Sequence, residues 1–80
     1  MLKLRIVSPE KVIFDGNVES LVVPGTSGRF EILNNHAPII SSLEKGNVEY
    51  NKEGGERQVL QVLGGFVEVK KNDVCICVEV

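Results

Sequence analysis

The chain has 80 residues, of which 42% are hydrophobic and 25% charged, and this composition indicates one small globular domain rather than a disordered segment. Nine basic and eleven acidic residues give a net charge of −2, with the two signs interspersed and no basic stripe. Because phosphate binding depends on clustered lysine and arginine, we expect no nucleic-acid partner.

The first residues alternate in polarity rather than forming an apolar signal segment. Leu2, Leu4 and Ile6 alternate with Lys3 and Arg5, which predicts a half-buried strand. We therefore expect no secretion or transit segment here. Apolar runs throughout the chain are far shorter than the about 20 residues that span a bilayer, so no membrane insertion is expected.

The rest of the chain is predicted to form short strands separated by turns. Turn residues gather at 8–10, 15–17, 24–28, 34–38, 44–46, 51–56 and 70–73. No segment has apolar residues at i, i+3, i+4 and i+7 over three turns, so no substantial helix is predicted. About nine or ten short strands that need a second apolar face indicate an all-β fold, a sandwich or flattened barrel.

The alternation also selects a candidate core and one irregular position. The predicted core residues are Leu4, Ile6, Phe14, Leu21, Val23, Ile32, Val59, Val62, Phe66, Val69, Ile76 and Val78. Gly64 and Gly65 stand between two apolar strands, which predicts a bulge or a close approach of another backbone. The glycine spacing lacks a G-x-G-x-x-G pattern and no helix follows, so dinucleotide binding is not expected.

His36 is the only histidine and lies in the polar segment 34–38, which Pro38 closes. A general base needs a nucleophile and an orienting partner, and no motif around His36 supplies them. We therefore expect no catalytic residue, and we expect His36 to stabilise the turn or to face a partner protein. A pH-dependent contact through the imidazole is the alternative.

Cys75 and Cys77 are the only cysteines and occupy alternate positions of a predicted strand. Their Cα atoms would lie about 6.5–7 Å apart, which is poor geometry for a mutual disulfide. Two cysteines and one distant histidine do not make a four-ligand zinc site. They are interpreted as small packed side chains in a reducing compartment, and neither a metal nor a cofactor is expected.

Lys70 and Lys71 lie at a predicted hairpin tip. Small all-β domains that carry biotin or lipoate present one lysine at such a tip, so a swinging-arm function is one alternative. The other interpretation is that two solvated lysines discourage edge-to-edge pairing of strands.

Three segments of the chain support a family resemblance. Residues 4–10, LRIVSPE, and the FDG at 14–16 match V-S/T-P and F-x-G elements. Residues 28–40 are similar to a G-x-[LF]-G-I-L-P-[GN]-H-A-P-L motif, and residues 64–69, GGFVEV, to G-G-[FIL]-x-E-V. In this order they resemble, over the whole chain, the N-terminal domain of the epsilon subunit of F-type ATP synthases, called delta in mitochondria.

The resemblance implies a sandwich of two five-stranded sheets and a rotor part without catalytic residues, cofactor or small-molecule substrate. In that family the domain binds the gamma subunit and sits on the polar loops of the membrane-embedded c-ring. It thereby couples transmembrane ion flow to ATP synthesis elsewhere in the complex. The implied location is peripheral, on the cytoplasmic face of a bacterial inner membrane. An unrelated β-sandwich adaptor is the remaining alternative.

The matching positions imply two sets of contact residues. The residues on the gamma-facing side would be Ser8, His36 and Ser41. The residues toward the c-ring would be Gly25, Gly28, Arg29, Phe30 and Glu31. Asn34 and Asn35 should lie near the junction.

Three positions depart from the family pattern. Glu31 stands where the family usually has glycine, Asn34 where proline is common, and Arg29 where several members have an acid. Because charges two apart on a strand share a face, Arg29 and Glu31 are expected to form an altered electrostatic contact with the ring. Reversing both charges should weaken ring binding in a salt-dependent way.

Most members of that family continue into two C-terminal helices that restrain rotation and, in some, bind ATP. This sequence ends at Val80, after its last predicted strand. The expectation is therefore that residues 1–80 form a single β-sandwich domain without the helical hairpin, and without inhibition of rotation or ATP binding.

Overall fold

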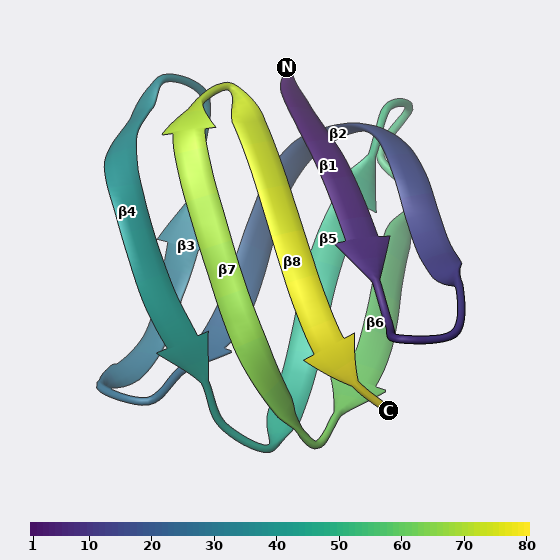
Figure 1. Cartoon of the computed structure of the whole chain (residues 1–80). Helices are drawn as coiled ribbons and strands as arrows, with labels where there is room; N and C mark the ends of the chain where they lie inside the picture. The colour runs from purple at the N-terminus through teal and green to yellow at the C-terminus, as the bar shows by residue number, and fades with distance from the viewer.

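The computed structural model describes all 80 residues, and every regular element in it is a strand (Figure 1). The strands are β1 (Leu2–Val7), β2 (Val12–Gly25), β3 (Gly28–Ile32), β4 (His36–Leu43), β5 (Gly46–Lys52), β6 (Arg57–Val62), β7 (Gly64–Lys71) and β8 (Asp73–Glu79). The predicted all-β sandwich is confirmed. No helix in the structure is long and apolar enough to cross a membrane.

The long strand β2 builds both layers of the sandwich. Its first part pairs with β1, and beyond an irregularity between Val18 and Ser20 its second part pairs with β3 and β5. One layer has the order β2, β1, β8, β7, β4, and the other has the order β3, β2, β5, β6. When β2 is counted in each layer, the sheets have five and four strands, where the family resemblance implied five and five.

The predicted turn at residues 15–17 is wrong. The segment Asp15-Gly16-Asn17 continues β2 because it pairs with residues 3–5 of β1 in an unbroken antiparallel register. The break predicted at Pro24 and Gly25 also shifts, since β2 runs through both and only residues 26 and 27 form the turn. In both places pairing with a neighbouring strand overrides the local turn preference.

The core is one cluster of buried apolar residues between the layers. Its members are Leu2, Leu4, Ile6, Val18, Leu21, Val23, Ile32, Leu43, Val48, Tyr50, Val62, Val67, Val69, Val74, Ile76 and Val78. The core prediction is wrong for two residues, because Val59 and Phe66 have 56% and 47% of their surface exposed. Phe66 points outward because its neighbour Val67 points inward, and successive side chains of a strand face opposite sides.

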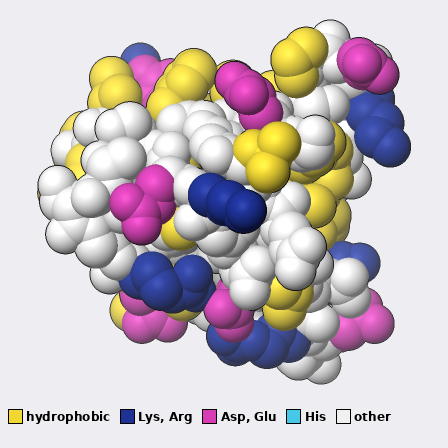
Figure 2. Space-filling model, turned by 90° about the horizontal axis from the view of Figure 1, so that it is seen from below, with side chains coloured by type: hydrophobic (Ala, Val, Ile, Leu, Met, Phe, Trp, Pro, Cys, Tyr) yellow, Lys and Arg dark blue, Asp and Glu magenta, His cyan; other side chains and the backbone are white.

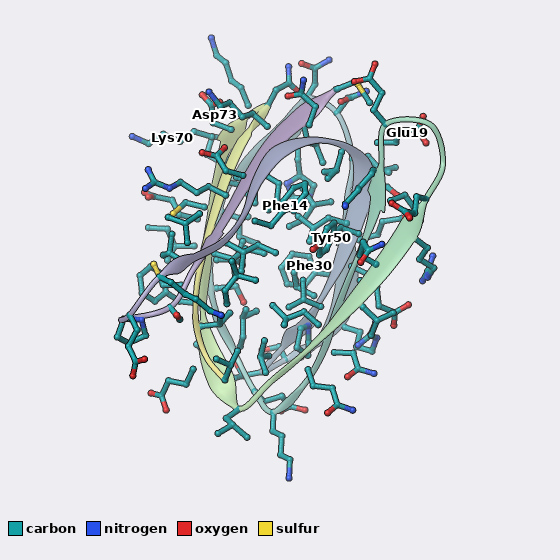
Figure 3. The ribbon with its side chains drawn as sticks, turned by 90° about the vertical axis from the view of Figure 1, so that its right-hand side faces the viewer. Phe14, Glu19, Phe30, Tyr50, Lys70 and Asp73 are labelled. Atoms are coloured by element: carbon teal, nitrogen blue, oxygen red, sulfur yellow. The ribbon has the colours of Figure 1, made fainter.

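Three aromatic side chains meet inside the sandwich. Phe14, Phe30 and Tyr50 come from β2, β3 and β5 and point toward one another between the layers (Figure 3). The ring centroids of Phe14 and Tyr50 lie 4.7 Å apart with the planes tilted by 43°. Burial raises the pKa of Tyr50. Phe14 and Phe30, which are half-buried, extend the apolar core toward both ends of β2.

The turns gather at two opposite ends of the sandwich (Figure 1). At one end lie the β3–β4 and β7–β8 turns around Asn35 and Asn72, which we call the asparagine end. At the other lie the turns at residues 26–27 and 44–45 and the step at Leu63, which we call the glycine end after Gly25 and Gly28. The two ends therefore present different loops to any partner.

Candidate functional site

The tip of the β2–β3 hairpin is fastened to the end of β4. The Thr26 backbone N–H donates to the Ser42 carbonyl oxygen at 3.1 Å, and the hydroxyls of these residues also lie 3.1 Å apart. The Glu44 N–H donates to the Pro24 carbonyl at 2.9 Å. Gly25 is buried at this junction. The glycine end thus has a fixed shape, and hydrophobic groups and both signs of charge are interspersed on its surface (Figure 2).

Arg29 extends from β3 across the outer face of its layer to β5. Its guanidinium donates to the Asn47 carbonyl oxygen at 3.0 Å and to the Glu49 carboxylate at 2.8 Å. Arg57 from β6 donates to the same carboxylate. The hydrogen bond from Arg57 and the charges of both arginines hold the pKa of Glu49 below its usual value. Arg29 is therefore already paired within the chain.

The other residues expected to face the c-ring differ in what they expose. Gly28 is exposed at φ +128°, with open space where a side chain would be. Phe30 points into the sandwich, and its ring lies close to Gly25. Glu31 is exposed on β3 and takes part in none of the three salt bridges. Of the five residues, only Glu31 presents an unpaired charge.

His36 begins β4 rather than lying within the predicted turn. The residue that makes the turn is Asn35, at φ 58°, whose N–H donates to the Asn72 side-chain oxygen at 2.7 Å. The Asn72 amide donates in return to the Asn35 side chain at 3.2 Å. The half-buried His36 has its Nδ1 2.8 Å from the Ala37 carbonyl oxygen. Asn35 and Asn72 thus join two turns, and His36 sits directly beside them.

Ser8, His36 and Ser41 lie in or next to the five-stranded layer but do not form one cluster. Ser8 follows β1, and its hydroxyl donates to the Lys11 carbonyl at 3.3 Å. Ser41 lies on β4 on the same side as the buried Leu43, and its hydroxyl donates to the Ser42 carbonyl at 3.1 Å. Strands β8 and β7 lie between β1 and β4. Any partner that contacts all three residues must span this layer.

Apolar side chains that the sequence did not single out lie on the outer face of this layer. Ile40 on β4 is 72% exposed, and Phe66 is close to it on the paired strand β7. A shallow hollow beside Phe66 is lined also by Ser8, Pro9 and Cys77. The alternation of Phe66 with Val67 was the sequence signal for an outward-facing aromatic. Exposed apolar groups that are surrounded by polar ones are typical of a protein interface.

No group of three or more His, Cys, Asp or Glu side chains is arranged to hold a metal ion. No buried side-chain nitrogen or oxygen lacks a hydrogen-bond partner. The polar groups at both ends are used mainly for turns and for strand-to-strand links.

The whole chain matches one known family. A family model described as the β-sandwich domain of the ATP synthase delta/epsilon chain matches residues 1–80. The chain belongs to this family. This membership confirms the resemblance drawn from the sequence motifs. It gives no support to the biotin or lipoate carrier alternative, although Lys71 does lie at the β7–β8 turn with φ 54°.

Relatives of the family from several bacteria are similar to the chain. An ATP synthase epsilon chain of Leptospira interrogans is 49% identical over 75 residues, which cover 94% of this chain and 58% of that protein. One from Synechocystis is 40% identical over 77 residues, covering 96% of this chain and 56% of that protein. The chain thus spans little more than half the length of the curated relatives that it matches.

Solved structures share the fold of this delta/epsilon-family domain. A chain in the mitochondrial ATP synthase of Euglena gracilis, determined with OSCP, F1 and the c-ring, superposes with a TM-score of 0.90 at 23% identity, covering 96% of this chain and 49% of that one. A chain in the central stalk and c-ring assembly of Tetrahymena thermophila gives 0.81 at 20% identity, covering 99% and 63%.

Proposed function

We propose that this domain is a docking part of the central stalk of a rotary ATP synthase, binding the gamma subunit and seating it on the polar loops of the c-ring. It would thereby couple ion flow to ATP synthesis without supplying a reacting group or a cofactor. The observation that supports this most is the family match along residues 1–80. The proposed location is peripheral, on the cytoplasmic face of a bacterial inner membrane.

The five-stranded layer is the proposed gamma-binding face. His36 and Ser41 lie on its edge strand β4, Ser8 directly follows its strand β1, and its outer surface exposes Ile40 and Phe66. Ser41 is on the inner side of β4, so a partner would reach it around the edge of the layer. Apolar anchors of this kind supply much of the free energy of protein association when a partner covers them. Ser8 borders the hollow beside Phe66, so a partner seated there would reach both.

The glycine end is the proposed c-ring contact. The hairpin tip at residues 26–27 is held in place by Ser42 and Glu44, so it can meet a partner with little loss of conformational freedom. Glu31 offers a free carboxylate on the adjoining strand, while Arg29 is occupied by Glu49. The charge contact with the ring is therefore assigned to Glu31 rather than shared equally with Arg29.

Binding assays with purified partners test the two faces separately. Gamma should be retained by the wild-type chain and lost with His36→Glu, because the substitution places a charge against the proposed gamma contact. The purified c-ring should bind Glu31→Lys more weakly, with a smaller salt dependence than for the wild type. Glu53→Lys, the same charge reversal at the exposed β5–β6 tip, is the matched control and should bind both partners normally.

The proposal fails if gamma binds neither the wild-type chain nor any variant. It also fails for the ring if Glu31→Lys and Glu53→Lys bind equally well. Loss of gamma binding in His36→Glu counts only if the variant keeps the wild-type circular dichroism spectrum, which separates a contact effect from unfolding.

A further inference from the structure

Two thiols lie side by side on the outer face of the five-stranded layer. Cys75 and Cys77 alternate on β8 with the buried Val74, Ile76 and Val78, so both point away from the core. Both are free and partly exposed. β8 pairs with β1 on one side and with β7 on the other, and these two ladders fix the backbone spacing between the cysteines.

That spacing is too long for a disulfide and suits a single bridging ion. Side chains two apart on one face of a strand are separated by about 6.6 Å, whereas disulfide-linked Cβ atoms lie about 3.5–4.5 Å apart. A metal–thiolate bond is about 2.3 Å for zinc, so two such bonds in line place the sulfurs about 4.6 Å apart. Rotation about the two Cα–Cβ bonds can bring the sulfurs to this separation without moving the strand.

We propose that Cys75 and Cys77 form a two-thiolate site for one soft monovalent metal ion, for which Cu(I) is the probe. Soft thiolate ligands favour Cu(I), which accepts two ligands in a line. Structural zinc sites instead take four ligands in a tetrahedron, and no group of three or more possible ligands exists in this chain. The site should therefore discriminate strongly between Cu(I) and Zn²⁺.

The surroundings of the two thiols set the pH dependence of binding. Arg5 on β1 and Glu68 on β7 flank Cys75 in register, while Val7 and Phe66 flank Cys77. Burial and the neighbouring thiol raise the pKa of Cys75, with Glu68 acting in the same direction and Arg5 against it. Two S–H bonds are replaced by two S–Cu bonds, two protons leave to solvent, and copper keeps its oxidation state. Affinity should therefore rise with pH through the neutral range.

An anaerobic titration against a chromophoric Cu(I) chelator tests the site. The wild-type chain should take one Cu(I) per chain without a change in its elution volume on gel filtration. Cys75→Ser and Cys77→Ser should each lose more affinity than the about 10–100-fold that follows loss of an outer-shell partner. Serine is nearly the same size as cysteine and both positions are partly exposed, so these variants should fold.

A matched control keeps two thiols but changes their spacing. Cys77→Ser combined with Glu79→Cys places the thiols four residues apart on the same face, about 13 Å from each other. This variant should bind as weakly as Cys77→Ser alone. The proposal is overturned if the control matches the wild type, if a single serine variant keeps full affinity, or if one ion bridges two chains. Equal affinity of the wild type for Zn²⁺ and Cu(I) would overturn it as well, and this measurement needs no variant.

Discussion

Two glycine-containing corners of the sandwich have opposite properties. At Gly65 the backbone of β8 lies so close that a Cβ would be 2.1 Å from the Cys77 carbonyl oxygen. At Gly28 the same atom would meet nothing within 4 Å. Both residues have φ values that side chains rarely adopt, +146° and +128°. One glycine is therefore required by packing inside the domain, and the other shapes an exposed tip that a partner can approach.

Substitution of Gly65 should give the largest effect. Gly65→Ala adds a clash with backbone to a strained φ, and we expect a loss of about 3–5 kcal/mol in the free energy of unfolding. Gly64→Ala is the matched control, because its nearest neighbour, the Leu43 carbonyl oxygen, is at an ordinary 3.6 Å. Urea denaturation of both variants measures the difference. Similar stabilities would refute the close approach.

Gly25 should be intermediate, since it is crowded although its backbone is ordinary. A Cβ there would lie 2.8 Å from the Gly28 carbonyl oxygen and 2.9 Å from the Phe30 ring. Gly25→Ala should cost about 2 kcal/mol. Combining it with Phe30→Leu should cost less than the sum of the two single changes, because part of the clash is with the ring. If the losses of unfolding free energy measured in urea simply add, the whole cost of Gly25→Ala comes from the clash with the backbone.

Gly28→Ala should be milder, at about 1 kcal/mol, because only backbone strain opposes it. If the tip is the contact, Gly28→Ala should weaken the free energy of c-ring binding by more than it lowers the free energy of unfolding. Comparing c-ring affinity with urea midpoint for Gly25→Ala and Gly28→Ala separates these quantities. If ring affinity simply follows stability in both variants, the tip has no special part in binding.

The smallest effect is expected at the Arg29–Glu49–Arg57 cluster beside this tip. The pKa of Glu49 is lowered on folding, so its stabilising contribution is present above the unfolded value of about 4.5 and is lost as pH falls through the folded one. The melting temperature of Glu49→Gln should lie slightly below that of the wild type at pH 7, and the gap should close in acid and in high salt. Glu53→Gln, at the exposed hairpin tip, should show no such gap.

Much of the fold was predictable because strand periodicity is a local property. The alternation of Leu2, Leu4 and Ile6 correctly identified β1 and its buried face. The predicted close approach at Gly64 and Gly65 is also confirmed, at Gly65, by the position of the Cys77 carbonyl. Local signals of this kind need no knowledge of the partner strand.

Most of the errors come from pairings that the sequence does not contain locally. The choice of Val59 is different, because Val59 shares its face of β6 with Arg57 and Gln61, whereas the alternation puts Leu60 and Val62 on the buried face. The pairing that keeps residues 15–17 in β2 comes from β1, which lies elsewhere in the chain. The Arg29–Glu49 ion pair joins residues 20 apart, and no spacing rule within a strand predicts such a contact.

The parallel pairing of β1 with β8 has a consequence for synthesis of the chain. Leu4 faces Val74 and Ile6 faces Ile76 in this ladder, so β1 stays without this partner until the ribosome has also made β8, the eighth strand of the domain. Until then one edge of β1 is unpaired, and nascent chains on neighbouring ribosomes could associate through it. The positive charges of Lys3 and Arg5, which stand at alternate positions of β1, would discourage that association during translation.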